Sequence, residues 1–276
     1  MDELNSKDYW EDRLKENFGL HGTGFQGLGR RYNEYMYKVR RRVFFHRMSK
    51  LDIDFANVNV LDIGSGTGFY VGLWKDLGAI SITGTDITTV AVENLRSMYP
   101  SNEFFQIDIG DEVAYKTLGK KFDIISAFDV LFHIVDDTRY ENAIRNIFSL
   151  LKPGGLFIFS DNFLHRDSIR SARQVSRSLS VIQKVLRENH FEIILRRPMF
   201  VLMNTPVDTN RSVLRAIWHT ITSAVQYSES MAFIICTVLY PMELLLVSIT
   251  KESPSTEMMI CRSANSKAAT KPNINK

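Results

Sequence analysis

Residues 60–70 read VLDIGSGTGFY, and the glycines of this stretch decide how the chain is interpreted. Gly64, Gly66 and Gly68 alternate directly after an apolar run that contains Asp62. Glycines with such spacing usually form a loop whose backbone can approach a ligand closely. We therefore expect a ligand-binding loop here, and the sequence on either side has to identify the ligand.

On both sides of this loop, apolar runs alternate with segments of helical periodicity. Such alternation predicts right-handed crossovers and a mainly parallel, doubly wound α/β sheet. Strands are predicted within residues 58–64, 80–86, 103–111, 156–162 and 191–197, and a further strand starts within 121–134. Helices are predicted at residues 67–79, 88–100, 139–155 and 168–190.

An aspartate stands at the end of each of the first five predicted strands. These residues are Asp62, Asp86, Asp108, Asp129 and Asp161. Ligands of doubly wound sheets bind beyond the carboxyl ends of the strands, so five acids at this edge indicate a functional site. Aspartate is also common in loops and as a helix N-cap, which accounts for Asp111 and would account for any one of the five alone.

The spacing of the glycines separates two classes of ligand. A dinucleotide-binding loop follows the pattern G-x-G-x-x-G, whereas here the third glycine comes one residue early and Phe69 stands in its place. Asp62, two residues before the first glycine, disfavours a pyrophosphate at this loop. A ligand with a cationic end would tolerate this carboxylate.

The composition is that of an ordinary globular protein. The chain has 276 residues, of which 45% are hydrophobic and 24% charged, and a net charge of +3 gives no global attraction to nucleic acid. Cys236 and Cys261 are the only cysteines, which argues against a disulfide framework or a cysteine-based metal site. The polar, acidic first residues do not resemble a signal peptide, so we expect a cytoplasmic location.

Taken together, these segments resemble the Rossmann-like (class I) S-adenosylmethionine-dependent methyltransferases. VLDIGSGTG resembles the first motif of that family, TGTDIT the second, FFQIDIGD the adenine-contacting segment, FDIISAFDVLFHI the fourth-strand motif and LLKPGGLFIFSD the segment before the fifth strand. The match covers about residues 55–200 in the usual order and spacing. The resemblance implies a seven-stranded sheet whose last strand is antiparallel, and STEMMICRS at 255–263 is the candidate for that strand.

The resemblance also implies the residues that bind the cofactor S-adenosylmethionine. They are Asp62, Gly64, Ser65, Gly66, Gly68, Asp86, Ile87, Asp108, Ile109 and Phe128. In this arrangement Asp62 would lie near the cationic amine, Asp86 would accept from both ribose hydroxyls, and Asp108 would accept from the adenine amine. Ile87 would pack against the adenine, and Phe128 would lie near both cofactor and acceptor.

Four residues are candidates for catalysis at the same edge: His133, Asp129, Asp161 and His165. A hydroxyl acceptor must lose its proton, and His133 is the first candidate base because an imidazole titrates near neutrality. His133 could equally pack at the start of a helix or contact the cofactor. Asp161 with His165, or His133 with Asp136 and Asp137, could form a metal site, but no tight ligand motif is present and we predict no metal.

The residues before the first strand are rich in aromatic side chains. Tyr9, Trp10, His21 and Tyr32 could wall the site or could pack on the first strand. A helix with the apolar positions Tyr32, Tyr35, Met36, Val39 and Val43 carries Lys38, Arg40, Arg41, Arg42 and Arg47, which we interpret as a basic outer face. A solvated face is the common explanation for such charges, and contact with a polyanion or an anionic membrane is the alternative.

Residues 231–249, MAFIICTVLYPMELLLVSI, approach the length of a membrane span. Glu243 and Pro241 interrupt the segment, and one spanning helix would separate two strands of the same sheet. We therefore predict that residues 204–256 form a helical insertion, packed as a lid or lying on a membrane surface. The apolar residues of this segment predict a partly apolar acceptor if it closes over the site.

The sequence thus predicts an N-terminal helical cap at 1–54, a cofactor-binding core at 55–203, the insertion at 204–256, the last core strand at 257–263 and a disordered tail at 264–276.

The predicted function is S-adenosylmethionine-dependent methylation, and O-methylation in particular, of a small-molecule, sugar or lipid-linked acceptor. The family's Asn/Asp-Pro-Pro-aromatic motif is replaced by AFDVLFH, which disfavours a nucleic-acid amine, and we expect no nucleic-acid partner. The alternatives are a methyltransferase of RNA or protein, and an inactive binding protein of the same fold. A looser resemblance to bacterial methyltransferases of glycan and secondary-metabolite pathways adds no substrate, and a peripheral contact with the inner face of a membrane is a further expectation.

Overall fold

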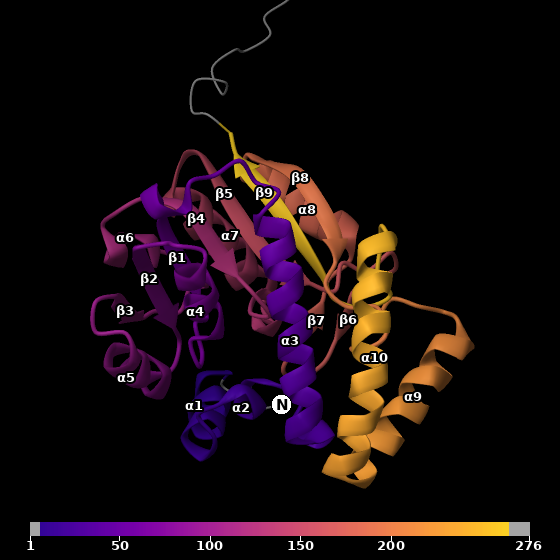
Figure 1. The fold of residues 1–276 in the computed structure, drawn as a ribbon. Coiled ribbons are helices and arrows are strands. Elements are labelled where there is room, and N and C mark those ends of the chain that lie inside the picture. Colours follow the sequence, from indigo (N-terminus) through magenta and orange to yellow (C-terminus); the bar gives the residue numbers. More distant parts are fainter. Residues whose placement is uncertain (1–5, 265–276) are drawn as a thin grey trace, which may run out of the picture.

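The protein forms one seven-stranded sheet with helices on both faces, in a computed structural model that describes residues 6–264 (Figure 1). The strand order is β3-β2-β1-β4-β5-β9-β8. The strands are β1 (Asn59–Ile63), β2 (Ser81–Asp86), β3 (Glu103–Gln106), β4 (Phe122–Ala127), β5 (Leu151–Asp161), β8 (Phe191–Pro198) and β9 (Glu257–Ser263). The first five are parallel, and β9 runs antiparallel to both of its neighbours, β5 and β8. The predicted doubly wound sheet with an antiparallel last strand is confirmed.

Alternation along the strands divides the core between the two faces of the sheet. Leu156 and Ile158 of β5 point to one face and Phe157 and Phe159 to the other. The first face is covered by α3 (Gly29–Met48), α4 (Phe69–Asp76), α5 (Thr89–Met98) and α10 (Glu229–Ile249). The second is covered by α6 (Tyr115–Leu118), α7 (Asp137–Leu150) and α8 (Leu179–Glu188). The parallel strands are therefore buried on both sides, and their carboxyl ends are the edge left for a site.

Two short N-terminal helices lie beyond that edge (Figure 1). These are α1 (Ser6–Glu16) and α2 (Leu20–Thr23), and the chain then continues through a short 3-10 turn at Gln26–Leu28 into the long helix α3. Asn33 holds this segment together, because its side chain accepts from the Phe25 amide (2.7 Å) and donates to the carbonyls of Phe25 (2.8 Å) and Gly29 (2.7 Å). The N-terminal helices can consequently cover the site as one fixed unit.

The chain between β8 and β9 contains α9 (Ser212–Tyr227) and α10, which is the predicted helical insertion. Glu243 ties α10 to the core: its buried carboxylate accepts from the amides of Val201 (2.6 Å) and Leu202 (2.8 Å). By length and composition α10 is apolar enough to cross a membrane, with a mean hydropathy of 2.1 over its most apolar 18 residues. However, β8 before it and β9 after it are paired in one sheet, and α10 itself packs along α3 (Figure 1).

All four helices predicted by range are shorter in the structure, and in two of them the missing residues form other elements. Residues 168–178 do not continue α8, because they form a small hairpin of β6 (Ile169–Arg170) and β7 (Val175–Ser176). Its anchor is Arg177, which is buried and donates to Asp137 Oδ1 (2.9 Å) at the start of α7. The helix predicted at 139–155 ends at Leu150, where β5 begins. The predicted tail at 264–276 lies, apart from Ala264, outside the described residues.

Candidate active site

The glycine loop connects β1 to α4 in a backbone conformation that requires glycine. Gly64, Gly66 and Gly68 have φ angles of 66°, 51° and 81°, in the left-handed region that other residues rarely adopt. A Cβ atom on Gly64 would also meet Val130 Cγ2 at 2.3 Å. Ser65 fixes the turn by donating its amide to the Thr85 carbonyl (2.9 Å). Gly66 is open on one side, since a Cβ there would meet only Thr23 Cγ2 at 3.4 Å and a backbone oxygen at 3.9 Å.

This loop forms the floor of a cavity of about 910 Å³. Eight of the ten predicted cofactor residues line it: Gly64, Ser65, Gly66, Asp86, Ile87, Asp108, Ile109 and Phe128. His133 and Asp129, two of the four predicted catalytic residues, line it as well. The structure therefore brings together residues from the ends of four strands, as expected for a doubly wound sheet.

Asp86 closes the floor from the end of β2. Its Oδ2 accepts from the Gly66 amide (2.8 Å), and its Oδ1 accepts from the Thr88 amide (2.9 Å) and hydroxyl (2.7 Å). Burial raises the pKa of Asp86, and these hydrogen bonds act against that shift. The carboxylate thus sets the shape of the glycine loop while it lines the cavity.

Asp108 lies at the end of the third strand and is paired with an arginine that the sequence interpretation missed. Its Oδ1 accepts from the Gly110 amide (2.8 Å), and its Oδ2 forms an ion pair with Arg139 Nη2 (2.7 Å). Arg139 belongs to the first turn of α7 and also lines the cavity. The end of the cavity that carries Ile87, Ile107 and Ile109 therefore combines apolar walls with one arginine–aspartate pair.

The opposite end of the cavity is built around Asp129. Asp129 has a φ of 58°, and Ser160 holds it there: Ser160 Oγ accepts from the Asp129 amide (2.8 Å) and donates to its Oδ1 (2.8 Å). Asp129 Oδ2 pairs with Arg40 Nη2 of α3 at 2.7 Å. Beside this pair, the ring of Phe128 stacks on that of Tyr70 with centroids 3.9 Å apart.

His133 ends a short 3-10 turn (Leu131–His133) above this end of the cavity. Its Nδ1 lies 3.1 Å from the Arg173 carbonyl oxygen, which can only accept, so Nδ1 carries the hydrogen. The lone pair of the neutral ring is then on Nε2. The edge of Trp10 packs against the ring with centroids 5.0 Å apart. Burial lowers the pKa of His133, which favours the neutral imidazole.

The N-terminal segment supplies the remaining wall. Trp10, Thr23, Tyr37 and Arg40 line the cavity, and Thr23 Oγ1 lies 2.7 Å from Tyr37 Oη. Of the four predicted wall residues, Trp10 alone reaches the cavity. Tyr9 packs on Trp10, His21 contacts Asn33, and Tyr32 is buried, where it donates to the Met203 carbonyl (3.1 Å). Arg40 and Arg47, which the sequence placed on a basic outer face, are buried.

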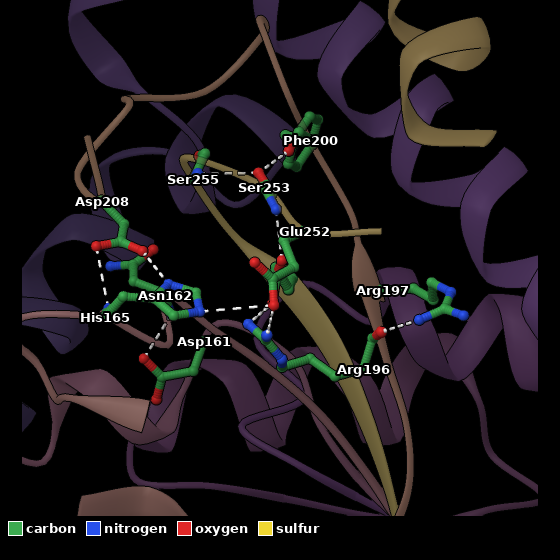
Figure 2. Close-up of polar contacts among 11 residues, drawn as sticks. Asp161, Asn162, His165, Arg196, Arg197, Phe200, Asp208, Glu252, Ser253 and Ser255 are labelled. Atoms are coloured by element: carbon green, nitrogen blue, oxygen red, sulfur yellow. Dashed lines mark hydrogen bonds and ion pairs between the residues drawn. The ribbon is translucent and has the colours of Figure 1, made fainter. Parts of the chain in front are cut away.

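Four predicted site residues do not line the cavity. Gly68 starts α4 behind the loop, and Asp62 is buried below it, where Asp62 Oδ1 accepts from Ser126 Oγ (2.6 Å). Asp161 is fully buried, and burial raises the pKa of both Asp62 and Asp161 to about 7. His165 lies in a separate cluster, shown in Figure 2, and its Nδ1 pairs with Asp208 Oδ2 at 2.6 Å. Asp62, Asp161 and His165 are therefore not among the described residues that form the wall of this cavity.

The predicted lid takes no part in this cavity, and neither of the two considered metal sites is assembled among the described residues. Among the described residues that line it, none comes from 204–256, because α10 packs on the far side of α3. His165 is engaged by Asp208, and Asp137 by Arg170 and Arg177. Within residues 6–264 no group of three or more His, Cys, Asp or Glu side chains is arranged to hold a metal ion.

Comparison with known proteins identifies the fold and the family. Residues 32–196 match the methyltransferase domain family. The chain is 29% identical over 143 residues to a ribosomal protein L11 methyltransferase of Lactobacillus gasseri, covering 50% of this chain and 38% of that protein. It is 29% identical over 110 residues to a ubiquinone biosynthesis O-methyltransferase of Pseudomonas putida, covering 39% and 46%. The chain thus spans less than half the length of these curated relatives.

Among solved structures, the magnesium protoporphyrin IX methyltransferase of Synechocystis with bound S-adenosylmethionine has the same fold. It aligns with a TM-score of 0.57 at 16% identity, covering 96% of this chain and 98% of that one. At this identity the likeness concerns the fold alone. The match nevertheless extends over the N-terminal helices and the insertion as well as the sheet.

Proposed function

The chain belongs to the S-adenosylmethionine-dependent methyltransferases, and we propose that it methylates a hydroxyl group of a small-molecule, sugar or lipid-linked acceptor. Its relatives act on acceptors as different as a ribosomal protein and a precursor in ubiquinone biosynthesis. The proposal for the acceptor therefore rests on the cavity of this chain.

The cavity fits the cofactor. The backbone at Gly66 has open space beside it, because a Cβ atom there would meet no more than one methyl carbon and one oxygen. Asp86 is placed to accept from ribose hydroxyls, and Ile87 and Ile109 offer apolar surface to a base. When bound, S-adenosylmethionine supplies a methyl group on a positively charged sulfur. A cavity of about 910 Å³ leaves room beside a nucleoside for part of a second molecule.

The geometry of His133 is the observation that favours a hydroxyl as the methyl acceptor. Its Nδ1 is committed to the Arg173 carbonyl, so Nε2 is the atom that can take a proton from a molecule in the cavity. A lowered pKa keeps this nitrogen unprotonated at neutral pH. A neutral amine would need no such base for its attack, whereas a hydroxyl gains from one.

The wall around His133 indicates what an acceptor should look like. Trp10, Phe128 and Tyr70 offer aromatic surface, and the Arg40–Asp129 pair offers polar atoms between them. Arg40 and Asp129 both line the cavity, so a polar oxygen of the acceptor can accept a hydrogen bond from the Arg40 guanidinium. We therefore infer a partly apolar acceptor that carries at least one polar oxygen.

The atom of the acceptor that receives the labelled methyl group tests this proposal. The enzyme is incubated with S-adenosylmethionine labelled in its methyl group and with matched phenols, alcohols, amines and thiols of the same ring system, and the products are analysed by mass spectrometry. We expect label on oxygen and none on nitrogen. Methylation of the amines alone, or of carbon, would refute the hydroxyl proposal and leave the family assignment intact.

A further inference from the structure

Helix α10 presents a continuous apolar stripe to solvent. Six of its exposed side chains are large and apolar and recur every three or four residues: Met231, Ile234, Val238, Met242, Leu245 and Ile249. Leu245 is 60% exposed and Ile249 66%, which is unusual for such residues. The stripe runs for about 27 Å along the helix at 1.5 Å per residue. A soluble surface rarely leaves so long an apolar line uncovered.

The opposite side of α10 fixes the direction in which this stripe points. Cys236, Leu239 and Val247 are buried, and Glu243 accepts from two backbone amides of the segment after β8. Tyr35 of α3 adds a contact, with its Oη 2.9 Å from Thr237 Oγ1. The stripe therefore cannot turn inward without loss of these contacts.

Basic side chains border the stripe. Arg42 of α3 lines a shallow surface groove together with Leu245, and Lys38 and Arg42 line the adjoining one with Tyr240. Apolar residues flanked by lysine and arginine are the pattern of helices that lie in the interface of a membrane.

The few acidic side chains described on the same face are already engaged. Asp76, which lines one of these grooves, is paired with Arg41 Nη1 at 2.8 Å. Between residues 211 and 251 the sequence has two acids, Glu229 and Glu243. Glu243 is buried, and Glu229 accepts from the amides of Arg30 (2.8 Å) and Arg31 (2.9 Å). A second copy of this chain, related by a two-fold axis, would bring the basic edges together, whereas the acids of this face are already buried or paired. Anionic lipid headgroups would meet them with opposite charge.

We propose that the α10 stripe docks on the surface of a bilayer that contains anionic lipids, with α10 lying in the interface. The stripe would enter the apolar boundary, while Lys38 and Arg42 would remain among the headgroups. The cytoplasmic leaflet carries such lipids, and the free, buried Cys236 and Cys261 suit a reducing compartment. This inference is independent of the identity of the methyl acceptor.

Sedimentation of the full chain with phosphatidylcholine vesicles, with and without phosphatidylglycerol, tests the docking. We expect binding that depends on phosphatidylglycerol and weakens with salt. The double variant Val238→Glu/Leu245→Glu should abolish sedimentation, and Lys38→Glu/Arg42→Glu should lower the partition coefficient about fivefold or more per residue. Ile80→Glu is the matched control, because Ile80 is apolar and 78% exposed but lies outside α10.

A second measurement reports insertion directly. Val238→Trp should show indole fluorescence that brominated lipids quench, whereas a tryptophan at Ile80 should not be quenched. Unchanged sedimentation of the Val238→Glu/Leu245→Glu variant would refute the proposal. The proposal would also be refuted if light scattering showed a dimer for the wild type and a monomer for this variant, and if neither protein bound vesicles. The dissociation constant of S-adenosylmethionine, measured by calorimetric titration, should be the same in all variants. A loss of docking can then be distinguished from damage to the active site.

Discussion

Arg40 and Asp129 form an ion pair within the wall of the cavity, with Arg40 Nη2 2.7 Å from Asp129 Oδ2. The two residues come from α3 and from the end of β4, so this contact joins the N-terminal helices to the catalytic edge of the sheet. Asp129 is held in a left-handed conformation by Ser160, and Arg40 lies against the rings of Tyr37 and Phe200. The pair is consequently part of the structural support of the site.

Loss of this pair should destabilise the fold. Arg40→Ala leaves Asp129 without its counter-charge in a half-buried position, and we expect a decrease in the free energy of unfolding of about 1–3 kcal/mol in urea denaturation. Arg41→Ala is the neighbouring control: Arg41 pairs with Asp76 on the surface, and its loss should cost less than about 1 kcal/mol. Equal effects of the two substitutions would contradict this role of Arg40.

Asp86→Ala should weaken cofactor binding. Its carboxylate shapes the glycine loop through the Gly66 amide and lines the cavity, so we expect a loss of about 1.5–3 kcal/mol, or about 10–150-fold in the dissociation constant of S-adenosylmethionine. Calorimetric titration measures this, with circular dichroism to verify the fold and Asp76→Ala as a remote surface control. An unchanged dissociation constant would remove Asp86 from the binding site.

His133→Ala should lower turnover by about 10²–10⁴-fold with little change in cofactor affinity. Because burial lowers the pKa of His133, the wild-type rate should rise with pH below about 6.5 and level off above it. The variant should lack this rise. His133→Gln can still donate to the Arg173 carbonyl but cannot accept a proton, so recovery of the rate in His133→Gln would indicate a positioning role and not a base.

The buried Asp62 should make stability fall as the pH rises. Its pKa is about 7 in the fold and near 3.8 in the unfolded chain, so between about pH 4 and pH 7 the native state binds the extra proton. The free energy of unfolding should decrease over this range, and Asp62→Asn should remove about 2–4 kcal/mol of that decrease. Urea denaturation at several pH values measures it, and parallel curves for wild type and variant would contradict the assignment.

The fold could be predicted from the sequence because its strands are apolar runs with glycine or aspartate at their ends. The same features identify Asp86, Asp108 and Asp129 as neighbours, since topology alone brings strand ends together. The hairpin at 168–178 was missed because Val175 precedes Leu179 by four residues and Ile182 by seven, which extends the helical spacing of α8 backwards. The hairpin is held by Arg177, which is buried against α7, and no local sequence pattern reveals that contact.

Arg40 was missed for a related reason. Five of the seven lysines and arginines of its helix fall within the ten positions 38–47, and a basic face was the natural interpretation. A signal was present, because Arg40 follows Met36 by four residues and precedes Val43 by three, which places it on the apolar side. Whether such an arginine faces a cavity depends on how α3 packs between the sheet and α10, and only the tertiary structure contains that information.

The position of β9 between β5 and β8 has a consequence for the order in which the protein can be built. On the ribosome, β8 leaves the exit tunnel well before Glu257–Ser263, yet it pairs in the main sheet through β9 alone. Until the last strand is synthesised, β5 keeps an open edge, and β8, α9 and α10 have no completed sheet to pack on. Because α10 precedes β9 in the chain, the most apolar helix leaves the tunnel before the strand that completes the sheet on which it packs.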